Sequence, residues 1–232
     1  MTDHNHEENE FYHRMIEFVE EKKKAIIYTV GAIIVVVAGY LAYQHYILKP
    51  KQKESQEVLA KVQDYFKQDS FSLVVNGAPG FKSAVQISSE YSSTKAGNLA
   101  NYYAGISYLK LGEYDNAIKY LKKFDSNGDK LVGALALACI GDAYVEKSDF
   151  KEGLKYYKQA LDYNTNELTT PIHARKALNV YIELKQYEDA LQLIAKLKKD
   201  ENTPADFKTE LDKYQGMIEA KNGKFNPDVN TK

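Results

Sequence analysis

Residues 100–108 read ANYYAGISY, and residues 112–124, after a gap of three residues, read GEYDNAIKYLKKF. The first segment carries small residues at helical spacing and ends in a tyrosine. The second places Tyr114, Ala117 and Leu121 three and four residues apart, which is the pattern of an amphipathic helix. Together the two segments predict a pair of helices joined by a tight turn.

The same two-helix pattern returns twice further along the chain. The first helix reappears as ALACIGDAY and HARKALNVY, and the second as SDFKEGLKYYKQAL and KQYEDALQLIAKL (residues 136–144, 173–181, 148–161 and 185–197). Equivalent small residues of the second helices, Ala117, Gly153 and Ala190, are 36 and 37 residues apart. A period in this range predicts stacked helix–turn–helix units, with the small residues at the crossings of paired helices.

The composition agrees with an all-α fold and excludes several classes of protein. Lysine and arginine number 31 against 32 aspartates and glutamates, so no net field attracts nucleic acid. Aromatic residues make up 12% of the chain, too many for a disordered protein. The single cysteine, Cys139, excludes an internal disulfide framework and a multi-cysteine zinc site. No proline interrupts the chain between Pro79 and Pro171, which favours long helices.

Residues 25–48, AIIYTVGAIIVVVAGYLAYQHYIL, contain no Asp, Glu, Lys or Arg. A helix of roughly 20 apolar residues crosses the hydrocarbon core of a bilayer, so this segment predicts a single transmembrane helix. A cleaved signal peptide is the less favoured alternative, because an acidic stretch of 24 residues precedes the segment. A buried core helix is also less favoured, because the segment is apolar on every side.

The flanking charges leave the orientation of this helix open, with four positive residues shortly before it and five after it. Three lysines directly before the apolar run, Lys22 to Lys24, favour a cytoplasmic N-terminus. Within the span, Gly31, Ala38 and Ala42 share one face, and small residues of this kind let membrane helices approach closely. We expect this face to pack against a partner helix.

Further segments are interpreted as caps at the two ends of the repeats. Before the repeats we expect a helix over about 52–68, a strand-like segment Ser70–Val75 and a helix over 81–88. After them, Thr203 is expected to cap a helix that begins at Pro204 and ends near Asn222–Gly223. The predicted organisation is an acidic N-terminal tail (1–24), a transmembrane helix (25–48), an N-terminal cap or atypical repeat (49–97), three repeats (98–202) and a C-terminal capping helix with a tail (203–232).

The sequence offers little that indicates catalysis. The stretch 125–129, DSNGD, resembles a calcium loop, but Lys130 stands where the loop needs glycine, so we interpret it as a turn between repeats. A Cys139–His173 nucleophile pair is conceivable between neighbouring first helices, yet no third orienting group accompanies it. We therefore expect no enzyme activity, no cofactor and no metal site.

At its signature positions the repeat resembles the tetratricopeptide repeat. Gly105, Tyr108, Ala117 and Leu121 match in the first unit, Gly141, Tyr144, Tyr157 and Ala160 in the second, and Tyr181 and Ala190 in the third, where Leu178 replaces the usual glycine. The resemblance implies an all-α helical solenoid that binds proteins. It also implies a concave groove lined by first-helix residues: Tyr102, Ile106 and Lys110, then Ala138, Asp142 and Glu146, then Arg175, Asn179 and Glu183. The alternative is that these residues form only solvated helix faces.

Taken together, the tail, the anchor and the small repeat domain resemble the YfgM-type ancillary subunits of the SecYEG translocon. That resemblance implies a single-pass protein of the bacterial inner membrane with a cytoplasmic N-terminus and a periplasmic repeat domain. It implies the SecYEG-type translocon and a PpiD-type membrane-anchored chaperone as partners, with emerging polypeptides as clients. The alternative is an anchored tetratricopeptide adaptor of another cell-envelope complex.

Overall fold

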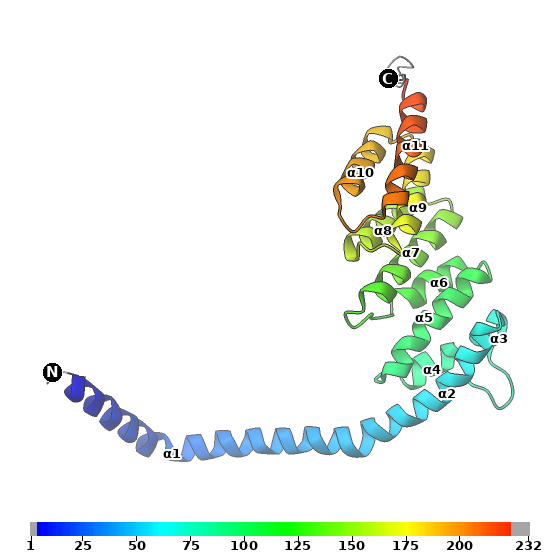
Figure 1. Ribbon diagram of the computed structural model, residues 1–232. Coiled ribbons are helices and arrows are strands. Elements are labelled where there is room, and N and C mark those ends of the chain that lie inside the picture. Colours follow the sequence, from blue (N-terminus) through cyan, green and yellow to red (C-terminus); the bar gives the residue numbers. More distant parts are fainter. Residues whose placement is uncertain (1–3, 224–232) are drawn as a thin grey trace. The chain divides into compact units, whose positions relative to one another are not determined.

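The computed structural model describes residues 4–223, and this part of the chain is built from helices without a strand. The predicted all-α class is confirmed (Figure 1). In chain order the elements are α1 (His4–Tyr43), the π-helical turn η1 (Gln44–Leu48), α2 (Lys49–Lys67), α3 (Phe71–Asn76), α4 (Ala84–Glu90), α5 (Lys95–Lys110), α6 (Tyr114–Leu121), α7 (Lys130–Glu146), α8 (Phe150–Tyr163), α9 (Thr170–Glu183), α10 (Tyr187–Lys199) and α11 (Ala205–Lys221).

The chain divides into two compact units between Lys53 and Glu54. Helical backbone runs from His4, so the part of the predicted tail that is described belongs to α1. The helical stretch from Glu20 to Lys67 is long and apolar enough to cross a membrane by length and composition. Its wide turn η1 ends two residues before Pro50, and the N–H of Lys49, the residue between them, bonds back to the carbonyl of Gln44. Because proline has no N–H, the regular helical ladder is interrupted at this point.

In the second unit, one turn geometry joins the two helices of every repeat. Gly112, Ser148 and Lys185 each adopt a positive φ, of 77°, 62° and 56°. The next residue's N–H then bonds to the carbonyl of a tyrosine five positions back, at 2.9 Å in all three cases, those tyrosines being Tyr108, Tyr144 and Tyr181. This hydrogen bond satisfies a carbonyl at the end of the first helix and reverses the chain. The three predicted repeats therefore share the same hairpin.

Glycines set the distance between the paired helices in the first two repeats. A Cβ on Gly105 would lie 2.5 Å from Cγ of Leu121, and one on Gly141 would lie 2.6 Å from the Tyr157 ring. Opposite Gly141, a Cβ on Gly153 would lie 2.5 Å from Cγ2 of Val145. The small residues Ala117 and Ala190, expected at equivalent crossings, are fully buried.

Two details of the predicted caps are wrong. Residues Phe71–Asn76 form the short helix α3, and not a strand. A run of six residues is too short for periodicity to separate the two, and burial of Val74 and Val75 against neighbouring helices decides the conformation. Thr203 does not cap α11, because Pro204 keeps an extended backbone (ψ 144°) and the helix begins at Ala205. The hydroxyl of Thr203 is buried without a partner.

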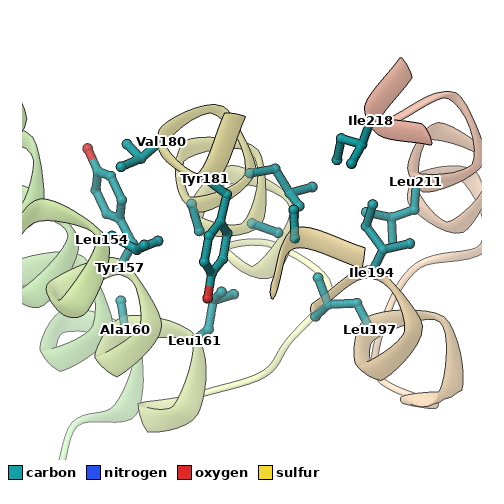
Figure 2. Close-up of a cluster of buried hydrophobic side chains, with 14 of the residues drawn as sticks. Leu154, Tyr157, Ala160, Leu161, Val180, Tyr181, Ile194, Leu197, Leu211 and Ile218 are labelled. Atoms are coloured by element: carbon teal, nitrogen blue, oxygen red, sulfur yellow. The ribbon is translucent and has the colours of Figure 1, made fainter. Parts of the chain in front are cut away.

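A continuous apolar core joins the second and third repeats to the C-terminal helix. Figure 2 shows side chains of α8, α9, α10 and α11 meeting in one cluster. Phe207, Leu211 and Ile218 of α11 are buried in it, as the predicted capping role requires. The end of the stack is thereby closed by an amphipathic helix.

His173, at the start of α9, is the unusual member of this interior. The residue is 1% exposed, and neither ring nitrogen has a hydrogen-bond partner. Burial is the main cause that lowers the pKa of its imidazole to about 4. The positive charge of Lys176 also lowers this pKa, while the negative charge of Asp142 raises it. The ring is therefore neutral in the folded protein at neutral pH.

The helix crossing of the second repeat can be tested by Gly141→Ala. The added methyl group would meet the Tyr157 ring, and overpacking of this kind costs about 1–3 kcal/mol. Gly216→Ala is the matched control, because nothing lies within 4 Å of its Cβ and alanine favours the helix. We expect urea unfolding of the full chain in detergent, followed by circular dichroism, to show lower stability for the first variant only. Equal stability of both would mean that the helices do not approach at Gly141.

The orphaned histidine predicts a specific pH dependence of stability. A free histidine ionises near pH 6.5, so between about 6.5 and 4 the unfolded chain binds a proton that the folded chain excludes. Stability should therefore fall as the pH drops through this window. His173→Leu should remove that contribution. The free energy of unfolding of the variant minus that of the wild type should therefore rise by on the order of 1–3 kcal/mol when the pH is lowered from 7.5 to 4.5. A difference that does not change with pH would contradict a buried neutral ring.

Candidate protein-binding groove

Three of the predicted groove residues, Lys110, Asp142 and Glu146, line one cleft on the first helices of the first two repeats. The cleft has a volume of about 470 Å³. Its walls are Leu109, Lys110, Tyr114, Asp142, Val145, Glu146, Tyr157 and Lys176. Four of these side chains are aliphatic or aromatic, and four are charged. Mixed surfaces of this kind are typical of sites that bind polypeptides.

The carboxylate of Asp142 is neutralised within the domain. The ammonium group of Lys176 lies 2.7 Å from both of its oxygens, and the hydroxyl of Tyr157 donates a hydrogen bond of 2.7 Å to Oδ1. Burial and this neighbouring carboxylate raise the pKa of the Tyr157 phenol far above its usual value. Asp142 therefore joins α7, α8 and α9, and its charge is largely compensated before any partner arrives.

Lys110 and Glu146 keep more of their charge available at the cleft. Both residues are exposed, and Glu146 accepts only a long hydrogen bond, 3.3 Å, from the hydroxyl of Tyr114. Within residues 4–223, Lys110 has no ion pair or hydrogen bond through its side chain. One free cation and one weakly bonded anion thus face the same opening.

Tyr102 and Ile106 occupy the first-repeat positions of the predicted groove but are half-buried. The Tyr102 ring lies 5.1 Å from the Phe124 ring and 5.9 Å from the Tyr103 ring. Burial raises the pKa of Tyr102 to about 12, with Cys139 and Tyr103 adding to the shift. Both residues pack on the cluster that contains Ala136 and Ile140, so Tyr102 supports the stacking of the repeats, and neither residue lines the cleft.

In the third repeat, the C-terminal helix contacts the predicted residues. The Arg175 guanidinium donates two hydrogen bonds of 2.7 Å to the Glu210 carboxylate and lies 5.1 Å from the centre of the Phe207 ring. This pairing lowers the pKa of Glu210. Asn179 accepts a weak hydrogen bond of 3.5 Å from Tyr214. Arg175 therefore fastens α11 to α9, while Glu183 remains exposed at the end of α9.

Sequence reasoning missed several residues of the cleft. Leu109 and Val145 lie three residues after Ile106 and Asp142, on the same helix face, so helical spacing could have found them. Tyr157 and Lys176 could not be found in this way, because a second helix and the next repeat bring them to the cleft.

Cys139 and His173, the residues weighed as a nucleophile pair, do not form one. Burial raises the pKa of the Cys139 thiol to about 11, the opposite of what activation of a nucleophile requires. No hydrogen bond reaches either ring nitrogen of His173. Cys139 contributes to the half-buried surface between the first two repeats.

The small residues expected to pack in the membrane lie on α1. Gly31, Ala38 and Ala42 are exposed, and nothing lies within 4 Å of a Cβ built on Gly31. The face of α1 that carries these three residues is therefore exposed in the single chain.

Comparison with known families gives one match. The tetratricopeptide repeat family matches residues 100–126 and 136–167, which cover the hairpins α5–α6 and α7–α8. The third predicted unit, α9–α10, lies outside the match, in agreement with Leu178 at the position where the first two units carry glycine. No curated protein matches the chain. The matched segments, together with the repeated hairpin geometry, show that the chain contains tetratricopeptide repeats.

Proposed function

We propose that this chain is a membrane-anchored interaction module that binds a polypeptide segment in the cleft between Lys110 and Glu146. The observation that carries the proposal is the composition of this cleft. The charges of Asp142 and Lys176 are already paired with each other, so an incoming segment meets Leu109, Val145 and two tyrosines without a large desolvation cost.

The two available charges would then set the direction of the bound segment. Lys110 and Glu146 have opposite sign and lie on neighbouring first helices. Charges at the edge of an interface contribute more to specificity than to affinity. A segment with an apolar centre and one charge of each sign at its ends fits this arrangement.

We further propose that the chain is an accessory subunit of the Sec translocon. The support is the layout of a candidate membrane helix followed by a small tetratricopeptide domain, which resembles the YfgM-type subunits. In this proposal the N-terminus is cytoplasmic and the repeat domain is periplasmic. The partners are the SecYEG-type translocon and a PpiD-type chaperone, and the clients are emerging polypeptides.

The face of α1 formed by Gly31, Ala38 and Ala42 would contact a membrane helix of the same complex, since small side chains allow close packing in lipid. An anchored adaptor of another cell-envelope complex, such as division or outer-membrane assembly machinery, is the second candidate. The same cleft supports this second candidate, which differs from the translocon proposal only in the protein that is bound.

Orientation is tested with single cysteines in a Cys139→Ala background. Lys221→Cys should react with a membrane-impermeant maleimide added from the periplasmic side, because the repeat domain would lie there. Glu17→Cys, on the other side of the candidate span, should react only after the inner membrane is broken. The reverse pattern would overturn the orientation and the translocon proposal with it.

The partner is tested with a photocrosslinking amino acid at Lys110, introduced into the full chain in cells. The translocon proposal predicts crosslinks from this position to translocon or chaperone subunits or to exported chains, identified by mass spectrometry. Position 199, exposed on α10, is the control and should give at least fivefold less product. Crosslinks from 110 to other envelope proteins would support the adaptor instead. Equal yields from both positions would show that the cleft is not the binding surface.

A further inference from the structure

A cluster of lysines and tyrosines lies on α6 and the residues directly after it, on α7 and on α8, and none of its members lines the cleft described above. Four ammonium groups lie 5.4–5.9 Å from the centres of three tyrosine rings. We call this surface the lysine–tyrosine patch; its members are Lys119, Lys122, Lys123 and Lys155 with Tyr120, Tyr144 and Tyr156. Lys122 and Lys155 lie over the same ring, that of Tyr156.

The patch carries positive charge that the domain does not compensate. Elsewhere, lysines of one repeat pair with carboxylates of a neighbouring repeat: Lys147 with Asp115, Lys176 with Asp142, and Lys196 with Asp162. In the described part of the patch, only Lys155 pairs with a carboxylate, and that partner, Glu152, lies on its own helix α8. Within residues 4–223 no carboxylate lies within ion-pair distance of Lys119, Lys122 or Lys123. Lysines concentrated in this way attract an anionic partner.

The tyrosines hold these cations in place. Tyr144 and Tyr156 are stacked at 5.5 Å with an angle of 14° between their rings, and Tyr108 and Tyr120 at 5.5 Å with 22°. Lys122 donates a hydrogen bond of 3.0 Å to the Tyr144 hydroxyl. A positive surface that is already ordered loses less conformational entropy on binding.

Next to Lys122 and Lys123 the surface opens into a cleft of about 320 Å³. Its apolar wall is formed by Leu121, Phe124, Ala136, Leu137 and Ile140. Tyr163 closes one side, with its hydroxyl 2.6 Å from Oγ of Ser126. The carboxylate at this cleft, Asp125, accepts a hydrogen bond of 2.8 Å from the N–H of Asn127. A hollow of this size fits one large apolar side chain.

We infer that the lysine–tyrosine patch and this cleft form a second docking site, whose partner is an acidic polypeptide segment with one large apolar side chain. The carboxylates would contact Lys119, Lys122 and Lys123, and the apolar side chain would enter the cleft. An anionic lipid surface would satisfy the lysines but is flat and would leave the cleft empty. The combination of charge and hollow therefore favours a polypeptide. The inference does not depend on the groove of the first helices.

The test uses the full chain in an uncharged detergent and three fluorescent acidic pentapeptides, each with a central Leu, Phe or Met between two pairs of glutamates. Fluorescence anisotropy should show binding of at least one of them, weakened by added salt. Lys119→Gln combined with Lys123→Gln should reduce the affinity roughly five- to tenfold. These two lysines donate no hydrogen bond within the described residues, so the fold should persist, which circular dichroism checks.

The matched control is Lys199→Gln combined with Lys221→Gln, which removes the same charge from α10 and α11 and should leave the affinity unchanged. A groove variant, Lys110→Gln, should also leave it unchanged, which separates this site from the proposed groove. Absence of binding by all three peptides would overturn the inference. So would equal binding of peptides with lysine in place of glutamate, or equal loss in the control variant. If nanodiscs with phosphatidylglycerol, and no peptide, protect Lys123 from acylation, the surface contacts membrane and the inference is wrong.

Discussion

The close approach of two helices within each hairpin is the constraint on which the repeat domain depends. In the second hairpin, Gly141 and Gly153 face each other, and the carbonyl of Gly141 would lie 3.2 Å from a Cβ on Gly153. This contact leaves no room for a side chain, and it brings Tyr157 against α7, where its hydroxyl reaches Asp142. The third hairpin has Leu178 at the glycine position, fully buried, and its helices approach each other over fewer residues. The family match also ends before this hairpin.

The turn that closes each hairpin also appears where the repeat pattern is not recognisable. At the end of α2, Asp69 has a φ of 54°, and the N–H of Ser70 bonds to the carbonyl of Tyr65 at 3.0 Å. At the end of α2, as at the ends of α5, α7 and α9, a residue of positive φ stands four positions after a tyrosine whose carbonyl accepts the hydrogen bond of the turn. Outside glycine, such a conformation costs about 1–2 kcal/mol, and the buried helices that follow it must offset this cost. The segment before the first repeat is therefore constructed like a hairpin with a shortened second helix.

Polar contacts between neighbouring hairpins determine which charges remain for binding. Arg175 and Lys176 pair with Glu210 and Asp142, which join α9 to α11 and to α7. These contacts remove charge from the groove and leave it largely apolar between Lys110 and Glu146. Among the described residues, no carboxylate pairs with Lys119, Lys122 or Lys123 at the end of α6, and tyrosine rings support these lysines instead. The groove therefore keeps little uncompensated charge, while the lysine–tyrosine patch keeps a positive charge.

The sequence by itself determined the helical class, the period of 36 and 37 residues, the hairpins and the apolar segment, because each depends on local spacing of small and apolar residues. The resemblance to the tetratricopeptide repeat also placed Lys110, Asp142 and Glu146 together, since Lys110 and Glu146 occupy equivalent positions on neighbouring first helices and Asp142 lies one turn before Glu146. Only the tertiary structure decided the rest. Short segments such as α3 carry too little periodicity, and their conformation follows from the surface that buries them. The roles of Arg175 and Lys176 depend on partners in neighbouring units, and the role of Tyr157 depends on the other helix of its hairpin. Their distance in the chain carries no local signal, and packing alone brings those partners within hydrogen-bonding reach.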